Sequence, residues 1–122
     1  MLSIYDEFIV LAFRYTDNAQ NVWQDILYPL QIQDEHTCVG CKVQKAYNTM
    51  WGTIRDDVMD DLKEFKKLTD IKKLYITGIS LGGGLAAVSY IDLRHEEIFE
   101  EMEMITFGAP RVGNKKWAEH FD

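Results

Sequence analysis

Apolar segments of strand length alternate with segments of helical periodicity along most of the chain. Residues 8–13, 74–77 and 102–107 are short runs rich in branched and aromatic side chains, which is typical of buried strands in a parallel sheet. Apolar residues also recur at helical spacing within 47–68 and 81–93. This alternation predicts an α/β architecture with a mostly parallel sheet, flanking helices and right-handed crossovers.

Weaker signals occupy the rest of the chain. A short amphipathic stretch contains Val22 and Trp23, a strand interrupted by Pro29 is predicted at 26–32, and a last helix is expected to begin near Asn114. No linker or repeat separates the segments, so we expect one domain. In the predicted helix at 47–68, acidic residues precede lysines on a face that we interpret as solvated. The apolar stripe of this helix is formed by Tyr47, Trp51, Ile54, Val58, Leu62 and Phe65.

Composition narrows the classes of function. The 122 residues suffice for one small core, and a formal charge of −7 disfavours a general nucleic-acid binder. No apolar run approaches the roughly 20 residues that span a bilayer. Asp6 and Glu7 stand where a secretory signal would carry positive charge, so we expect no signal peptide within this sequence and leave its compartment open.

The two cysteines, Cys38 and Cys41, form a single C-x-x-C pair. One such pair cannot supply four zinc ligands, and no histidine follows it at zinc-finger spacing. We therefore interpret the pair as loop cysteines, either reduced or joined in a local disulfide, and expect no cofactor and no resident metal. A redox or metal-binding role is the alternative.

The strongest motif is G-x-S-x-G, at 78–82, between a predicted strand and a predicted helix. Ser80 would occupy the apex of a sharp, strained turn that exposes its hydroxyl above the sheet. Gly78 and Gly82 would avoid collisions with the neighbouring strand and helix. The backbone N–H of Leu81 would then point to where an oxyanion develops, so Ser80 is a candidate nucleophile.

The same glycines allow a second interpretation. Gly82, Gly84 and Ala87 satisfy G-x-G-x-x-A, the dinucleotide-binding pattern. The acidic residue expected about 20 residues later should end the next strand, whereas Glu101 and Glu103 stand at the start of theirs. A nucleotide-binding α/β domain is therefore the third function that we consider.

Four segments, taken together, resemble the class 3 (fungal-type) lipases of the α/β-hydrolases. T-G-I-S-L-G-G at 77–83 is similar to the family's T-G-H-S-L-G-G, and 106–114 is similar to its T-F-G-x-P-R-V-G-N. F-R-Y-T at 13–16, followed by Asn21 and Asp25, resembles F-R-G-T/S…N…D, and 43–47 weakly resembles V-H-x-G-F. The segments occur in family order, so the resemblance implies a partial α/β-hydrolase fold that lacks terminal strands.

The resemblance implies a serine ester hydrolase acting on acylglycerols or related esters. Ser80 would carry the acyl group, and the backbone N–H groups of Leu81 and Thr16 would form the oxyanion hole. A hinged lid would run from 17 to 24, open at a lipid surface, and expose an acyl groove. Tyr15, Val22 and Trp23 are the candidates for substrate and lid contacts.

The sequence departs from the family pattern at several positions. Ile79 replaces a histidine that packs beside the nucleophile, and Gln44 and Ala46 replace a histidine and a glycine in the weakest motif. Tyr15 replaces a glycine, which would misaim the Thr16 N–H.

The triad partners of the serine are also missing from the expected places. The resemblance places the triad acid and histidine beyond Asn114, in the order Ser, Asp, His, whereas His120 precedes Asp122 on a predicted helix. We expect surface or capping roles for His36, His95 and His120.

These observations predict that residues 1–122 form the central part of one lipase-like domain, incomplete at both ends. The leading function is hydrolysis of lipid esters. A non-catalytic remnant that binds lipid or a protein partner is the alternative.

Overall fold

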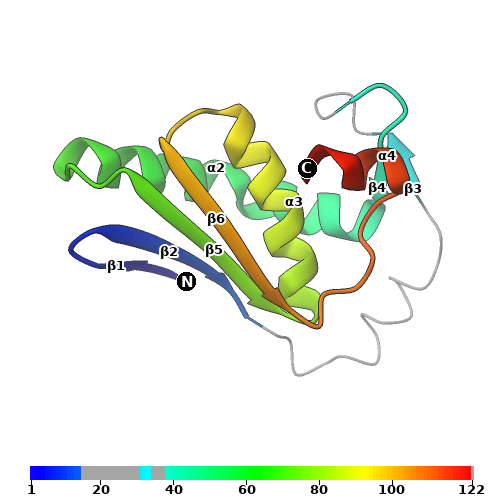
Figure 1. Cartoon of the computed structure of the whole chain (residues 1–122), viewed down its shortest axis with the longest axis horizontal. Helices are drawn as coiled ribbons and strands as arrows, with labels where there is room; N and C mark the ends of the chain where they lie inside the picture. The colour runs from blue at the N-terminus through cyan, green and yellow to red at the C-terminus, as the bar shows by residue number, and fades with distance from the viewer. Residues whose placement is uncertain (15–30, 34–37, 122) are drawn as a thin grey trace.

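A computed structural model describes residues 1–14, 31–33 and 38–121. Its main element is a four-stranded sheet with the order β1-β2-β5-β6. The strands are β1 (Leu2–Ile4), β2 (Phe8–Phe13), β5 (Lys73–Ile79) and β6 (Glu101–Phe107). β2, β5 and β6 are parallel to one another, whereas β1 pairs antiparallel with β2 (Figure 1).

The parallel register brings the carboxyl ends of three strands to one edge. Phe13 pairs with Gly78, and Ile79 pairs with Phe107. In parallel α/β sheets, ligands and catalytic groups gather at this edge, because the connecting loops leave the strands there. The predicted nucleophile therefore lies at the functional edge of the sheet.

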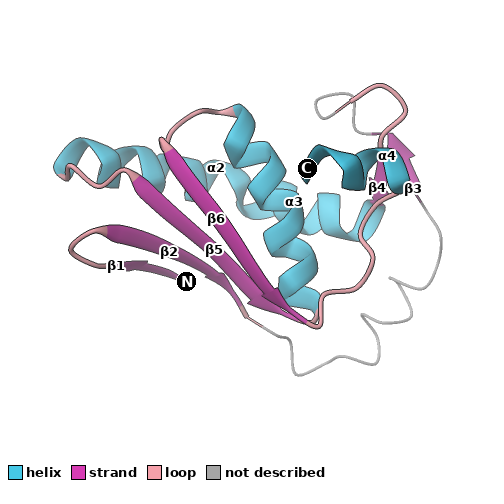
Figure 2. Ribbon diagram, in the orientation of Figure 1, coloured by secondary structure: helices cyan, strands magenta, loops and turns pink. Residues whose placement is uncertain are grey.

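Two long helices cover one face of the sheet (Figure 2). They are α2 (Lys45–Leu68) and α3 (Leu81–His95). Alternate residues of β2 and β5 face these helices and are buried, as the period of two in a strand requires. The largest fully buried side chains of this core include Tyr47, Ile9, Leu11, Leu62, Leu74, Ile76 and Leu93.

The opposite face of the sheet is exposed. Ile79, Ile105 and Phe107 are 55%, 51% and 59% accessible to solvent. Lys73 pairs with Glu103 on the same face, at 2.7 Å. Within the described part of the chain, β6 pairs only with β5, so its other edge is free.

A smaller unit packs beside the main sheet. β3 (Gln31–Gln33) pairs antiparallel with β4 (Lys42–Gln44), and β4 leads directly into α2. After β6 the chain returns to β4, where Gly113 forms a β-bridge with Val43. Two short helical elements follow, α4 (Lys115–Ala118) and the 3₁₀ turn η1 (Glu119–Phe121). Figure 1 shows α4 beside β4, far from β1.

The sequence predicted the main strands and helices but missed smaller elements. β1 and β4 are only three residues each, too short to show a period. The predicted strand at 26–32 is β3 at 31–33, and residues 26–30 lie outside the described chain.

Helix details also differ from the expectation. The apolar stripe of α2 includes Met59, which was not predicted, while Ile54 is 37% exposed at the stripe's margin. The last helix is one short α-helical turn followed by η1, with Asn114 as its N-cap. Among the described residues, no helix combines the length and apolar character needed to cross a membrane.

Candidate active site

Ser80 occupies the corner between β5 and α3. Its backbone has φ 53° and ψ −119°, a left-handed conformation that is costly for a residue with a side chain. Hydrogen bonds hold the corner on both sides. The Ser80 N–H donates to the Phe107 carbonyl at 2.8 Å, and the Gly83 N–H donates to the Ser80 carbonyl at 2.9 Å. Ser80 therefore has the strained strand-to-helix geometry of a nucleophile elbow.

Two glycines make this corner possible because other backbone atoms fill the space of their missing side chains. A Cβ on Gly78 would collide with the carbonyl group of Gly82. A Cβ on Gly82 would collide with the carbonyl oxygen of Phe13 and lie 3.2 Å from that of Arg14. The first turn of α3 thus packs directly on the end of β2.

This contact bears on the predicted oxyanion hole. Leu81 is the first residue of α3, where helical N–H groups have no partner within the helix. Gly82, in the first turn of α3, lies against the backbone of Phe13 and Arg14. The chain therefore ends β2 directly beside the helical turn that contains the Leu81 N–H. Tyr15, Thr16, Val22 and Trp23 lie outside the described residues, so the second donor and the lid stay predictions.

Tyr47 lies beneath the first turns of α3. Its ring occupies the space where a Cβ on Gly84 would be, and the side chain is fully buried. Its hydroxyl has no hydrogen-bond partner among the residues that the structure describes, and burial raises the pKa of Tyr47 to about 12. Gly82 and Gly84 of the G-x-G-x-x-A pattern therefore lie inside α3, packed against Phe13 and Tyr47. This close packing explains why both positions are glycine.

The described histidines lie far from Ser80. His95 is in the last turn of α3, and a helix of this length spans about 20 Å. His120 lines a cavity of about 240 Å³ with His95, Arg94 and Glu97. Neither histidine is placed to take the proton of Ser80, and His36 lies outside the described residues.

Asp92 is engaged in a cluster that joins α2 to α3. It accepts a hydrogen bond from Trp51 Nε1 at 2.7 Å and pairs with Arg55, which also reaches Glu96 at 2.7 Å. Hydrogen bonds and charge from these acids raise the pKa of Arg55 further above its ordinary value. The cluster holds α3 against α2. Asp92 lies near the carboxyl end of α3, whereas Ser80 precedes its amino end, so Asp92 does not reach the serine.

The segment after β6 has a structural role that the sequence analysis missed. Asn114 Oδ1 accepts from the N–H groups of Trp117 and Lys42, at 3.0 and 3.2 Å, and Asn114 Nδ2 donates to the Gly40 carbonyl at 2.9 Å. Gln44 Nε2 donates to the Arg111 carbonyl at 2.9 Å. Residues 111–114 therefore fasten α4 to the loop that precedes β4.

Cys38 and Cys41 are joined in a disulfide, with their Cα atoms 5.2 Å apart. This agrees with one of the two states expected for a loop pair. His120 lies close to both sulfur atoms. Residue spacing does not predict that His120 lies beside Cys38 and Cys41, because about 80 residues separate them in the sequence.

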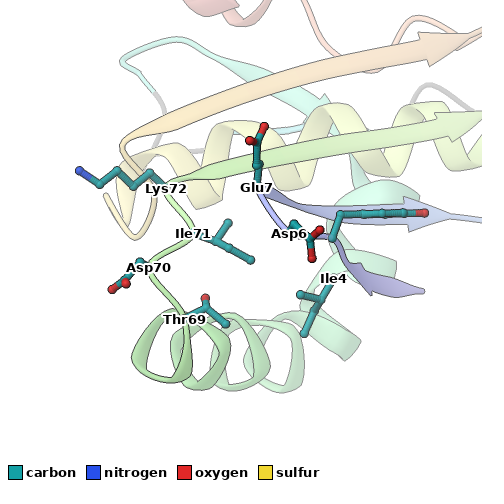
Figure 3. A pocket seen from close by; sticks show the side chains of 8 residues that line it. Ile4, Asp6, Glu7, Thr69, Asp70, Ile71 and Lys72 are labelled. Carbon is teal, nitrogen blue, oxygen red and sulfur yellow. The ribbon is translucent and has the colours of Figure 1, made fainter.

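A second hollow, of about 640 Å³, opens at the other end of the sheet (Figure 3). Its lining includes Ile4, Asp6, Glu7, Asp70 and Lys72, which precede β2 and β5. Ser80 follows the opposite end of β5, so this hollow is remote from the elbow.

Comparisons with known proteins identify the family of the chain. The family model described as "Lipase (class 3)" matches residues 10–122. The chain belongs to the class 3 lipase family. A secreted mono- and diacylglycerol lipase of Gibberella zeae is 31% identical over 93% of this chain, and one of Penicillium cyclopium is 29% identical over 92%. These matches cover 32% and 36% of the relatives, so the chain spans about a third of their length.

Solved structures of class 3 lipases have the same fold. The crystal structure of a mono- and diacylglycerol lipase from Aspergillus oryzae matches 94% of this chain and 41% of that chain, with a TM-score of 0.81 and 34% identity. A mutant form of the Penicillium cyclopium enzyme matches with a TM-score of 0.80 and 28% identity. The described sheet and helices are therefore part of an α/β-hydrolase fold.

Proposed function

We propose that the protein to which this chain belongs hydrolyses carboxylic esters of lipids through an acyl-enzyme on Ser80. The observation that carries the proposal is the backbone of Ser80, held at φ 53° between β5 and α3. A left-handed residue with a side chain costs about 1–3 kcal/mol, and such strain concentrates at functional sites. Membership of the class 3 lipase family supports the same conclusion.

The proposed reaction has two halves. Ser80 Oγ attacks the ester carbonyl while its proton passes to a base, and the carbonyl oxygen becomes an oxyanion near the Leu81 N–H. Collapse of this intermediate expels the alcohol and leaves the acyl group on Ser80. Water then attacks the acyl-enzyme, which releases the fatty acid and returns the proton to Ser80.

Part of this machinery would come from outside the described residues. We assign the second oxyanion donor to Thr16, and the base with its orienting acid to residues of the protein outside positions 1–122. Removal of one oxyanion donor costs about 2.7–4 kcal/mol of barrier, so the loop from Arg14 onward matters greatly for rate. Tyr15, Val22 and Trp23 would form the lid over the acyl groove.

The proposed substrates are acylglycerols with one or two acyl chains. The relatives from Gibberella zeae and Penicillium cyclopium are named mono- and diacylglycerol lipases, and this chain aligns with them over most of its length. We further propose that residues 1–122 are the central part of one larger domain. The free edge of β6 and the exposed apolar side chains of Ile79, Ile105 and Phe107 support this, because such surfaces are normally covered.

A fluorophosphonate probe tests the nucleophile. In the whole protein, with the triad base present, we expect labelling of one serine, abolished in Ser80→Ala, because such a probe reacts readily with a serine that a base activates beside an oxyanion hole. Ser89→Ala is the matched control, since Ser89 is buried in α3 and its hydroxyl donates to the Ala86 carbonyl at 3.0 Å. Equal labelling of Ser80→Ala and the unsubstituted chain would refute the assignment.

A non-catalytic role in lipid or partner binding is the second candidate. It is favoured by one observation, that neither His95 nor His120 lies near Ser80. If the whole protein is well folded by circular dichroism yet takes up no fluorophosphonate, this role is supported over catalysis.

A further inference from the structure

Three potential metal ligands converge where the loop before β4 meets the end of the chain. The Sγ atoms of Cys38 and Cys41 and a ring nitrogen of His120 all lie within 4.8 Å of one another. Cys41 is buried, Cys38 is half-buried and His120 is exposed. Two cysteine sulfurs and one imidazole are a ligand set with which zinc is bound in proteins when water takes the fourth position.

The turn that carries the sulfurs has a fixed shape. The Cys41 N–H donates to the Cys38 carbonyl at 3.2 Å, and Gly40 has φ 82°, which a side chain would disfavour. Lys116 Nζ lies over this turn, 2.9 Å from the position a Gly40 Cβ would take.

The histidine is fixed to the same turn by Asn114. The Asn114 amide donates to the Gly40 carbonyl, while its oxygen caps the helical segment that leads to His120. This side chain therefore connects the two parts of the cluster without using any of the ligand atoms. His120 is exposed, so solvent reaches the cluster at its imidazole.

We propose that Cys38, Cys41 and His120 form a redox-controlled site for a zinc-like divalent cation. In the oxidised state the disulfide occupies both sulfurs and no metal binds. A dithiol reductant supplies two electrons and two protons, breaks the S–S bond and becomes a disulfide itself. Metal binding then replaces both thiol protons, which pass to solvent, and neutral His120 donates the third ligand while water takes the fourth position.

Cobalt titration of the chain tests the proposal. The chain is reduced, freed of reductant under anaerobic conditions and titrated with Co²⁺ alone, and zinc is added afterwards. We expect thiolate-to-cobalt charge-transfer absorption that saturates at one equivalent and disappears when Zn²⁺ displaces cobalt. The oxidised chain should show no such absorption, since its sulfurs are bonded to each other.

Two histidine variants separate a ligand from a bystander. His120→Ala should weaken Co²⁺ binding by at least about tenfold. His95→Ala is the matched control, because His95 lines the same cavity but is not part of the ligand cluster, and its binding should be unchanged. Three results would overturn the proposal, namely no charge-transfer absorption after reduction, equal affinity of His120→Ala, or loss of the fold by circular dichroism when the disulfide opens.

Discussion

Gly78 illustrates how one missing side chain controls the corner that carries Ser80. A Cβ at this position would meet the backbone of Gly82, which cannot move away as a flexible side chain would. We expect Gly78→Ala to lower the free energy of unfolding by about 3 kcal/mol and, in the whole protein, to abolish fluorophosphonate labelling. Urea unfolding followed by circular dichroism measures the first effect.

Gly52→Ala is the matched control for this substitution. Gly52 lies in α2 with no atom within 4 Å of its Cβ position, so the substitution should stabilise the chain by about 0.5–1 kcal/mol. A Gly78→Ala variant as stable as Gly52→Ala would show that the corner can relax.

Tyr47 is the residue whose burial has the clearest energetic consequence. Its folded pKa of about 12 lies above the ordinary value of 10.0, so the neutral form is favoured in the fold. The resulting stability is present below pH 10 and is lost as the pH rises towards 12, by up to about 3 kcal/mol. Urea unfolding at several pH values should show this loss in the unsubstituted chain and not in Tyr47→Phe.

Tyr47→Phe has a second expected effect at neutral pH. Removal of a buried hydroxyl without a partner should leave stability unchanged or raise it by about 1 kcal/mol. Tyr90→Phe is the control, since Tyr90 is only half-buried and stacks on Phe121. A destabilised Tyr47→Phe would mean that the hydroxyl has an unrecognised partner.

Single residues were predictable from sequence where local geometry fixed their role. A strained backbone was predicted for Ser80 from its place between two glycines at a strand-to-helix corner, and its φ of 53° is such a conformation. The proximity of His120 to Cys38 and Cys41 could not be foreseen, because it depends on Asn114 fastening two distant segments. Periodicity and spacing contain no information about such a contact.

The contact between helices α2 and α3 depends on the Asp92 carboxylate. Asp92→Ala would leave the Trp51 N–H without its acceptor and leave Arg55 with Glu96 as its partner on α3. We expect a loss of about 1–2 kcal/mol in urea unfolding, since an unpaired, partly buried donor costs more than a surface pair. Glu96→Ala removes the more exposed acid and should cost less than about 1 kcal/mol. Equal losses for both variants would contradict the central position of Asp92.

The periodicity of the chain predicted whole elements better than their margins. The apolar runs located β2, β5 and β6, and the parallel order followed from their alternation with helices. β5 extends to Lys73–Ile79, beyond the predicted 74–77, because backbone pairing with β6 continues past the apolar core. Ile54 was expected inside and is partly exposed, because the helical stripe is set by contact with α3 and the sheet, which the sequence does not show.

At the scale of the whole molecule, the two faces of the sheet are unequal. α2 and α3 cover one face, while Ile79, Ile105 and Phe107 are exposed on the other, next to the free edge of β6. An exposed apolar edge strand pairs readily with another chain. We therefore expect residues 1–122 to self-associate as the protein concentration rises, which sedimentation velocity would measure.

Charge on the exposed face should weaken this association. Ile105→Lys places an ammonium group beside Thr77 at the centre of the apolar patch, and a lysine on an edge strand opposes pairing with a second copy. Ile54→Lys is the matched control, because it adds the same charge at a partly exposed position on α2, away from the patch. We expect Ile105→Lys to shift the chain towards monomer and Ile54→Lys to leave association unchanged. A monodisperse unsubstituted chain that melts cooperatively would mean that the exposed face needs no cover, and would remove the main support for a larger domain around these residues.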